Sequence, residues 1–307
     1  IKNFDNSTIS SIEKRWEPFD FENEDIDLFL DKLTIDKSVT VSSIKGGYSH
    51  ALTRLNAFLS EGYSDYAQYR SDPSKKASSQ MSPYFHFGQI STHEVFERIV
   101  EHDSWSPDKI NPTLVGRREG WWGGSLNFES FMDELITWRE LGYHTCVRRA
   151  NYNQYSSLPE WAIKTLHEHS DDERDHIYSL EQLTYSQTHD EIWNAAQNQL
   201  REQGVIQNYL RMLWGKKILE WSPNPQIALS YMITLNDRYS LDGRDPNSYS
   251  GVFWILGRYD RAWGPERKIF GKIRYMTSDS AARKFNLKPY LEKWGDSSQF
   301  IDSSSTK

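Results

Sequence analysis

The sequence predicts an all-α protein, and three observations support this prediction. Apolar residues recur at helical spacing over most of the chain. Alternating strand patterns of useful length are scarce, and glycine or proline stands where the helical patterns stop. We therefore expect one large helical domain over residues 46–294, preceded by a connector at 1–45 and followed by a disordered tail at 295–307.

The helices can be placed in order from this spacing. Gly204 separates two of them, as is common just after a helix C-terminus. Pro223 and Pro225 stop the second of these two, because proline cannot continue a helix. The expected helices cover residues 48–59, 128–147, 190–200, 205–221 and 226–235, with a shorter one near 25–33 in the connector.

The composition excludes several classes of protein. The chain has 307 residues, 37% of them apolar, so it can bury a sizeable core. A single cysteine, Cys146, rules out a disulfide framework, and no histidine or cysteine spacing predicts a metal site. No apolar run approaches the roughly 20 residues of a membrane span, and the start lacks a signal-peptide pattern. We expect a monomer without a membrane partner, cytoplasmic or, in a eukaryote, nuclear or organellar.

Charge is unevenly spread. The net charge is −7, yet residues 258–293 hold ten basic and four acidic residues, a local +6. A basic patch on an acidic body can bind phosphate groups locally. The alternative, a solvated charged face, is equally compatible with the charge count.

A possible phosphate site lies at residues 78–83, Ser-Ser-Gln-Met-Ser-Pro. Ser82 suits a helix N-cap and Pro83 the first helical position, so we expect a helix to begin there. Free backbone N–H groups at that start, with serine hydroxyls just upstream, can bind a phosphate or diphosphate. A helix cap without a ligand is the commoner explanation of such a string.

Tryptophan is abundant, with twelve in the chain. Trp214 and Trp221 are seven residues apart, so both indoles share one helix face about 10 Å apart. We expect Trp193, on the preceding helix, to fold back beside them. Three indoles in a row could relay an electron or form an aromatic core seam, and spacing alone favours the core.

Glu134 and Trp138 are four residues apart and are expected to be neighbours on one helix face. A carboxyl beside an indole can hydrogen-bond a planar ligand that is stacked on the ring.

The turn at residues 241–247 is unusually rich in charge. Asp242 could pair with an upstream arginine such as Arg211, and Asn236 and Asn247 could offer amides to a ligand. The alternative for each residue is an ordinary polar turn.

Taken together, these segments resemble the helical, flavin-binding half of the photolyase–cryptochrome family, most of all its class II cyclobutane pyrimidine dimer photolyases. Six motifs follow one another in family order over about residues 46–294, and six in order are far more specific than any one. They are residues 81–91 (MSPYFHFGQIS), 134–141 (ELITWREL), 188–197 (THDEIWNAAQ), 210–221 (LRMLWGKKILEW), 235–247 (LNDRYSLDGRDPN) and 269–276 (IFGKIRYM).

The resemblance implies that FAD binds at the centre of the helical domain. It assigns residues to the phosphates, to an ion pair beside the flavin ring and to a position near the ring's reactive nitrogen. These residues are Tyr66, Ser78, Ser79, Met81 and Ser82 for the phosphates, Arg211 and Asp242 for the ion pair, and Asn236 or Asn247 for the nitrogen.

The resemblance also implies a DNA substrate that contains a pyrimidine dimer. An electron from excited reduced flavin would split the dimer and then return, with the dimer flipped out of the duplex. The implied residues are Glu134 as the carboxyl that hydrogen-bonds the dimer, Trp138 and Trp254 as its apolar walls, Trp193, Trp214 and Trp221 as an electron relay, and Lys272, Arg274, Arg258 and Arg267 as DNA contacts.

A photoreceptor of the cryptochrome type without repair activity is the alternative, and a helical module that has lost flavin is a third. The family's N-terminal antenna domain has no counterpart, so we expect no antenna chromophore in this chain. The chain is then either a fragment or a short form, and an antenna partner in trans is not excluded. Gln207 replaces a histidine common in the family, which argues against the photoproduct-repair branch. Residues 106–125 match nothing in the family.

Overall fold

The computed structural model describes residues 6–16, 20, 22–23 and 25–295, and the chain divides into two compact units at Val39 and Thr40. The first unit holds α1 (Asn6–Arg15) and α2 (Ile26–Lys32). The carboxylate of Asp25 accepts hydrogen bonds from the backbone N–H groups of Asp27 and Leu28, and so caps the start of α2. The short helix predicted near residues 25–33 is therefore confirmed. The tail predicted at residues 295–307 lies outside the described residues from 296 onward.

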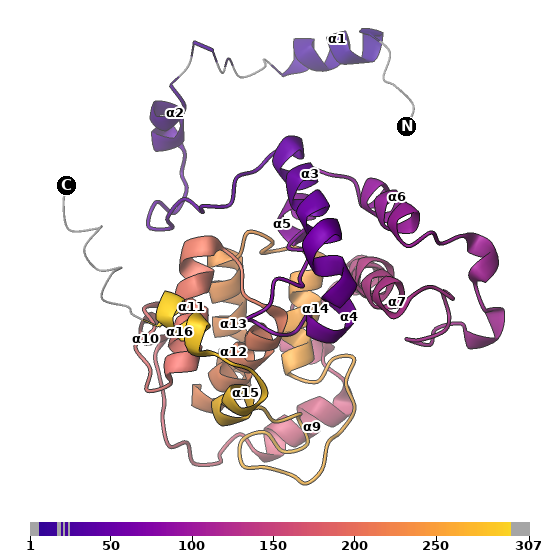
Figure 1. Ribbon diagram of the computed structural model, residues 1–307. Coiled ribbons are helices and arrows are strands. Elements are labelled where there is room, and N and C mark those ends of the chain that lie inside the picture. The colour runs from indigo at the N-terminus through magenta and orange to yellow at the C-terminus, as the bar shows by residue number, and fades with distance from the viewer. Residues whose placement is uncertain (1–5, 17–19, 21, 24, 296–307) are drawn as a thin grey trace. The chain divides into compact units, whose positions relative to one another are not determined.

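The second unit is built of helices (Figure 1), and the all-α prediction is confirmed. Over the described ranges there is no strand, and one isolated antiparallel bridge joins Arg267 to Gly271. Its α-helices are α3 (Tyr48–Ala57), α4 (Tyr66–Tyr69), α5 (Ser82–His86), α6 (Thr92–His102), α7 (Leu126–Met132), α8 (Arg139–Arg148), α9 (Glu160–Glu168), α10 (Leu180–Thr184), α11 (Glu191–Gln203), α12 (Asn208–Trp221), α13 (Pro225–Tyr239), α14 (Pro246–Ile255), α15 (Ser278–Lys284) and α16 (Lys288–Trp294).

Two π-helical segments interrupt this pattern. Phe58–Gly62 extends α3, and Asp133–Trp138 joins α7 to α8. The predicted helix at 128–147 is thus one continuous helical run with a π turn in its middle. A π turn closes i→i+5 hydrogen bonds, so it shifts which side chains share a face. Short 3-10 turns complete the connections at Tyr63–Asp65, Pro107–Lys109, Pro112–Leu114 and Tyr155–Ser157.

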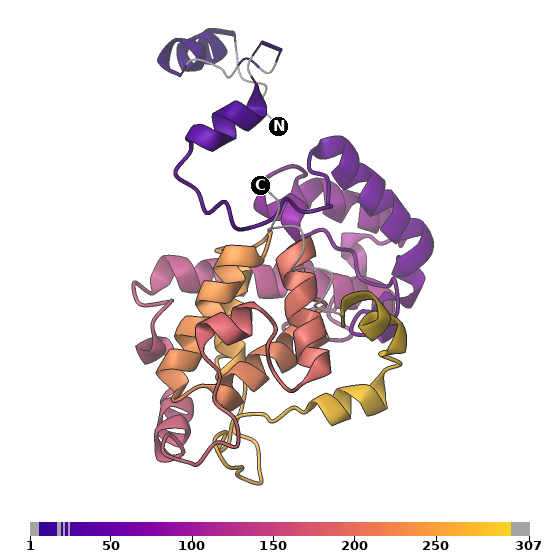
Figure 2. The ribbon, with the colours of Figure 1, turned by 90° about the vertical axis from the view of Figure 1, so that its left-hand side faces the viewer.

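Helix α12 lies at the centre of the second unit and packs against α11, α13 and α14, while α14 packs against α8 (Figures 1 and 2). Gly204 ends α11 in the left-handed conformation, with φ 71°, as its position after the helix predicted. Gly215 lets α14 approach α12 closely, since a Cβ at residue 215 would lie 2.0 Å from Cδ1 of Ile255. A separate hydrophobic cluster forms around Phe58 and Phe131, whose ring centroids stack at 5.5 Å, and it joins the π-helical extension of α3 to α7.

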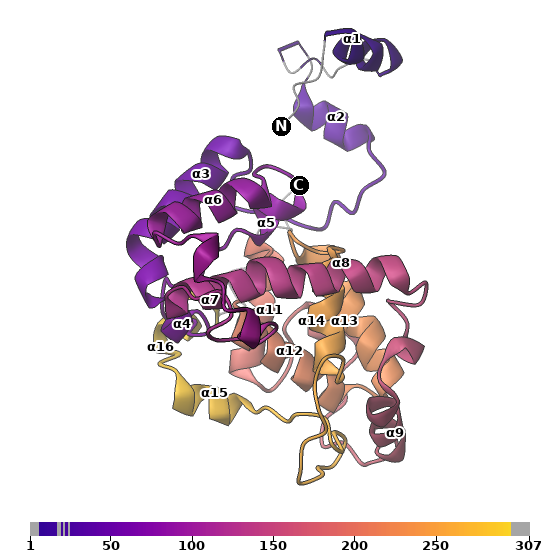
Figure 3. The same cartoon turned by 90° about the vertical axis from the view of Figure 1, so that its right-hand side faces the viewer.

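The long loop between α14 and α15 runs beside α9 (Figures 1 to 3). The backbone N–H of Lys272 donates to Oγ1 of Thr165 at 3.0 Å, and the N–H of Ile269 donates to Asp172 at 2.7 Å. Ile269 and Ile273 are buried, which leaves Lys272 exposed on the opposite side of the chain. Within the ranges the structure describes, no helix has both the length and the apolar character that a bilayer crossing requires.

Candidate functional site

Trp138 and Trp254 come together from two different helices. Trp138 ends the π-helical segment and Trp254 lies in α14, and their ring centroids are 4.5 Å apart at an interplanar angle of 45°. Both side chains are half-buried. The ring of Tyr259 contacts both of them, at 6.0 and 6.3 Å. The two tryptophans predicted as apolar walls therefore form one partly exposed aromatic surface.

The segment that holds Glu134 and Trp138 is π-helical, not α-helical as their spacing predicted. Because the segment is π-helical, the indole N–H of Trp138 reaches the residue five positions back and donates to Oδ2 of Asp133 at 3.0 Å. The carboxylate of Glu134 instead accepts a hydrogen bond from the guanidinium of Arg70. The sequence reasoning missed both Asp133 and Arg70.

Arg70 is held firmly at this place. Its guanidinium lies 5.6 Å from the ring centroid of Tyr66, and its carbonyl accepts a hydrogen bond from the Gln207 amide at 3.0 Å. Burial alone would lower the pKa of Arg70, but the charge of Glu134 outweighs it and the pKa is raised. Arg70 stands four residues after Tyr66, and that spacing was a signal that could have found it.

The predicted pair between Arg211 and Asp242 forms, with Nη1 and Oδ1 3.7 Å apart. Burial acts to raise the pKa of Asp242, yet the Arg211 charge and hydrogen bonds from Ser240 and Ser82 outweigh burial and lower it. The Asp242 carboxylate is therefore ionised near neutral pH. Through Arg211, Ser240 and Ser82, this carboxylate connects α12, the turn after α13 and the start of α5.

The expected cap at Ser82 is displaced by one residue. Helix α5 begins at Ser82 itself, Met81 occupies the N-cap without a capping side chain, and Pro83 follows. The Ser82 hydroxyl is consequently free to bond to Asp242, a longer-range contact that the local pattern could not show. Ser79 and Ser78, just upstream, offer their carbonyls to the Arg54 guanidinium at 2.9 and 3.2 Å.

The polar groups of this region are compatible with the flavin dinucleotide that the resemblance implies. The hydroxyls of Ser78 and Ser79 are partly exposed and bond to no other residue in the described part of the chain. Their backbone is braced, and Met81 beside them is buried. Hydroxyl groups of this kind suit phosphate oxygens, and a buried ion pair at Arg211 and Asp242 suits the polar edge of a planar ring.

The two candidate asparagines lie in different surroundings. Asn236 is buried in α13, with 4% of its surface exposed, and its amide donates to Asp237 at 3.3 Å. Asn247 is exposed in the first turn of α14, and its side-chain oxygen lies against α8, 2.8 Å from where a Cβ on Gly142 would stand.

The three relay candidates touch one another through Trp193. Its ring lies 5.7 Å from that of Trp221 at 70°, and its indole N–H donates to the Trp214 carbonyl at 3.0 Å. The indole of Trp214 donates to Gln197 at 2.8 Å. All three indoles are buried in the α11–α12 core. The ring of Trp193 contacts that of Trp221, whereas its bond to Trp214 is to the backbone carbonyl.

The predicted DNA contact at Arg258 is wrong, because this arginine is buried with 4% of its surface exposed. Its guanidinium covers the Phe253 ring at 3.8 Å and donates to the Tyr152 carbonyl at 2.8 Å and to the Ser157 hydroxyl. Burial lowers its pKa to about 10. Arg258 therefore ties α14 to the segment before α9 and is not available to a phosphate backbone.

The other three basic candidates are exposed on the loop between α14 and α15. Nζ of Lys272 lies 3.2 Å from Glu266, a surface pair that a stronger anion can displace. Arg274 covers the Trp263 ring at 5.1 Å, and Arg267 covers the Tyr275 ring at 5.1 Å.

Comparisons with known proteins bear on the fold and on the family of the chain. No family model matches the chain. The chain is 41% identical over 263 residues to the deoxyribodipyrimidine photo-lyase of Potorous tridactylus. The aligned region covers 85% of this chain and 46% of the relative. It is 42% identical over 252 residues to that of Methanothermobacter thermautotrophicus, covering 82% and 51%, and 40% identical over 238 residues to that of Arabidopsis thaliana, covering 77% and 44%.

Solved structures match the fold at lower sequence identity. A Synechocystis cryptochrome superposes with a TM-score of 0.59 at 15% identity, over 86% of this chain and 48% of that one. A class III photolyase from Agrobacterium tumefaciens gives 0.55 at 19% identity, over 81% and 44%.

The helical fold and these similarities define a photolyase–cryptochrome protein, and the chain belongs to that family. Within it, the chain groups with the class II cyclobutane pyrimidine dimer photolyases, over their helical region. The chain spans about half the length of the curated relatives it matches.

Proposed function

We propose that this chain is the FAD-binding catalytic part of a deoxyribodipyrimidine photolyase, a carbon–carbon lyase that splits pyrimidine dimers in DNA under blue light. The observation that carries the proposal is the paired Trp138 and Trp254, with Glu134 at the start of the same π turn as Trp138. A signalling flavoprotein has no need of a partly exposed aromatic surface beside a carboxylate.

FAD would be held by residues that already lie together. Ser78, Ser79 and Ser82 would bind the phosphates, in a segment packed on the buried Tyr66 and Met81. When bound, the flavin supplies the one-electron redox chemistry and the absorption of light. Of the two asparagines, we propose Asn236 for the ring's reactive nitrogen, because it is buried on α13 beside α12, which carries Arg211.

Lesion binding would use the aromatic surface and the carboxylate. Enzymes that act on bases within a duplex flip them out, and a flipped dimer would stack on Trp138 and Trp254. Glu134 would exchange its bond to Arg70 for one to the dimer, since the pair is partly exposed. Arg70 then becomes available to the phosphate between the two bases, and Lys272, Arg274 and Arg267 would hold the flanking backbone.

The test is a blue-light assay on an oligonucleotide that contains a thymine dimer, using the FAD-loaded full chain. Repair by the parent chain, with strong losses for Glu134→Ala and Trp138→Ala, is expected. Trp16→Ala is the matched control, because Trp16 is 60% exposed in the first unit. Normal photoreduction of flavin without repair would favour the photoreceptor alternative, and a colourless protein would favour the module that has lost flavin.

A further inference from the structure

The loop between α6 and α7, residues 104–125, lies beside α7 at the edge of the second unit (Figures 1 and 3). It contains the residues 106–125 that match nothing in the family. The loop is closed at its base, where the Ser125 hydroxyl donates to Oδ1 of Asp103 at 2.6 Å and the Ser125 backbone N–H donates to Oδ2 at 3.2 Å. Because its two ends are joined, α6 and α7 carry the loop as one unit.

Buried side chains fix the returning arm of this loop on α7. Trp105 is 7% exposed, its ring stacks on that of Phe128 at 5.0 Å, and its indole N–H donates to the Trp122 carbonyl at 2.7 Å. The backbone N–H of Gly123 donates to Oε1 of the buried Glu129 at 2.7 Å. The loop therefore has a small core of its own, and this core is continuous with α7.

Two glycines set the path of the backbone in this loop. Gly123 and Gly120 have φ values of 66° and 83°, in the left-handed region that favours glycine. The two arms of the loop approach closely, since a Cβ at Gly123 would lie 2.0 Å from the Lys109 carbonyl oxygen. The backbone N–H of Asn111 also donates to the Trp121 carbonyl at 2.9 Å. A loop that is already held in one conformation loses little entropy when it binds a partner.

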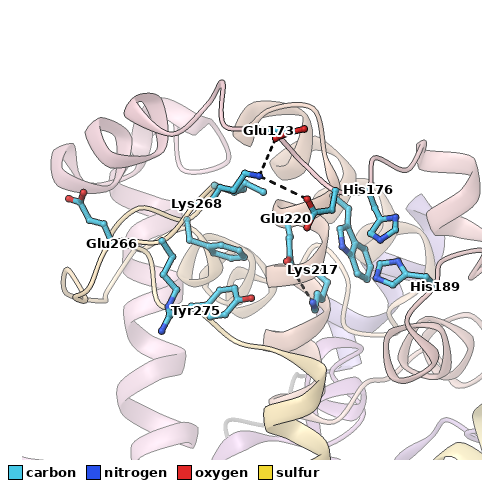
Figure 4. Close-up of a pocket in the computed structure, with 13 residues that line it drawn as sticks. Glu173, His176, His189, Lys217, Glu220, Glu266, Lys268 and Tyr275 are labelled. Atoms are coloured by element: carbon cyan, nitrogen blue, oxygen red, sulfur yellow. Dashed lines mark ion pairs between the residues drawn. The ribbon is translucent and has the colours of Figure 1, made fainter.

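Arg117 and Arg118 are exposed at the tip of the loop, between its two joined arms. Within the residues that the structure describes, neither guanidinium makes an ion pair, a side-chain hydrogen bond or a contact with an aromatic ring, and the neighbouring Glu119 pairs with neither. In the cavity of Figure 4, by contrast, Lys217 lies 2.9 Å from Glu220. The two arginines at the tip are therefore free to bind an anion.

The face of α7 that holds this loop also leads to the aromatic surface of Trp138 and Trp254. Glu129 binds the loop and Asp133 binds the Trp138 indole, and these two residues are four apart, hence neighbours on one face of α7. The helical run from Leu126 to Trp138 is about 20 Å long, because a helix rises about 1.5 Å per residue. That length corresponds to about six base pairs along duplex DNA.

We propose that the loop at residues 104–125 is a second DNA-binding element, in which Arg117 and Arg118 contact phosphates of the duplex about six base pairs from the flipped dimer. The proposal rests on the proposed function, because it takes the aromatic surface as the place of the dimer. Arginine suits this role, since its planar guanidinium can donate two hydrogen bonds to one phosphate. Val115, 64% exposed, is the one large apolar side chain at the tip that is strongly exposed, which is too little for the apolar centre of a protein interface.

Such a contact carries no sequence information. Phosphate contacts fix how a duplex lies on the protein, and they stabilise the complex with damaged and undamaged DNA alike. The loop would thus hold the flank of the duplex while the aromatic surface and Glu134 hold the dimer.

The test is fluorescence anisotropy of duplex binding in the dark, with the FAD-loaded full chain at several salt concentrations. Undamaged duplexes are compared with duplexes that contain one thymine dimer. The double variant Arg117→Gln/Arg118→Gln should reduce the slope of log affinity against log salt by about two on both kinds of duplex, because each arginine releases about one ion. Urea unfolding should give the same stability as the parent, since neither side chain has a partner in the described fold.

Arg98→Gln is the matched control. It removes a partly exposed arginine from α6, the helix that leads into the loop, where Arg98 pairs with Glu94 at 3.6 Å. This variant should leave the salt slope unchanged.

The length of the duplex tests the position of the contact. Dimer-containing duplexes are shortened to about three base pairs beyond the dimer, on the 5′ side or on the 3′ side. Shortening one of the two sides should abolish the difference between the parent and the double variant, whereas shortening the other should preserve it. A difference that persists whichever side is shortened would place the contact elsewhere and overturn the assignment.

The outcomes separate the two proposals. An unchanged salt slope in the double variant would overturn the role of the loop in DNA binding and point to a protein partner at its tip. An equal loss of slope in Arg98→Gln would overturn it as well, because overall charge would then explain the effect. A parent that binds damaged and undamaged duplexes equally would instead contradict the proposed function, and the undamaged duplex would still report on the two arginines.

Discussion

The rings of Trp138 and Trp254 lie 4.5 Å apart and form one aromatic surface, although Trp138 ends a π turn and Trp254 lies in α14. The Trp138 indole is fixed by its bond to Asp133, so the surface is set before any ligand binds. Preorganised aromatic rings lose little conformational entropy on binding a flat ligand.

Replacing either tryptophan of the aromatic surface, Trp138 or Trp254, should weaken binding of the pyrimidine dimer. Base stacking on an aromatic side chain contributes about 1–3 kcal/mol when measured by alanine substitution, so Trp254→Ala should weaken binding roughly 5- to 150-fold. Fluorescence titration with a dimer-containing oligonucleotide measures this, and Trp254→Phe should retain part of the affinity. Equal affinity in Trp254→Ala and the parent would contradict the assignment of the wall.

The pair between Arg70 and Glu134 should show measurable coupling in the absence of DNA. The pair is partly exposed, so a double-mutant cycle with Arg70→Met and Glu134→Gln should give a coupling free energy of about 1 kcal/mol. Urea unfolding of the four proteins provides the values. The i,i+4 pair of Lys164 and Glu168 is the control, and an equally small value for both pairs would show that Arg70 does not hold Glu134.

Because of Lys216, the free energy of unfolding should increase with pH in the alkaline range. It is buried, its ammonium donates to the Ile255 carbonyl, and burial lowers its pKa to about 7. Above that pH the unfolded chain still binds the proton that the folded chain has lost, so unfolding free energy rises with pH. The slope should be about 1.4 kcal/mol per pH unit up to roughly pH 10.

The Lys216→Met variant should lose this slope and should be more stable than the parent near pH 7. Urea unfolding at pH 7, 8 and 9 measures the difference in unfolding free energy between the variant and the parent. The titration of all other groups cancels in this difference. Lys164→Met, at an exposed lysine, should keep the slope of the parent. A difference between Lys216→Met and the parent that stays constant with pH would mean that Lys216 is charged in the fold.

The basic loop and the buried arginine should respond differently to substitution. Lys272→Gln and Arg274→Gln should each reduce the salt dependence of DNA binding by about one released ion, with little change in stability. Arg258→Gln should instead lower the unfolding free energy by roughly 1–3 kcal/mol, because Tyr152 and Ser157 lose a buried partner. An unchanged salt slope in Lys272→Gln would place the DNA elsewhere.

Local pattern was enough to predict most of the helices near the site. The period of 3.6 residues and the stops at Gly204 and Pro223 predicted α11 and α12, because helix formation and termination depend on near neighbours. The pair of Arg211 and Asp242 was also anticipated, because the charged turn at residues 241–247 suggested that Asp242 pairs with an upstream arginine.

Other features depend on contacts that no local pattern records. The π turn at Asp133–Trp138 lets the indole of Trp138 donate to Asp133, five residues back. A basic stretch predicts charge but not burial, and Arg258 proved to be a core residue because the Tyr152 carbonyl and the Phe253 ring surround it.

The sequence by itself determined the helical class, the family and the residue types of the site, because periodicity, capping and motif order are properties of neighbouring residues. Tertiary structure decided which of those residues meet. It brought Trp254 to Trp138, Arg70 to Glu134 and Tyr178 to Trp221. Such contacts depend on how elements distant in the chain pack, as α14 does on α8 and α4 on α7. Packing is a property of whole helix faces, and distance along the chain does not predict it.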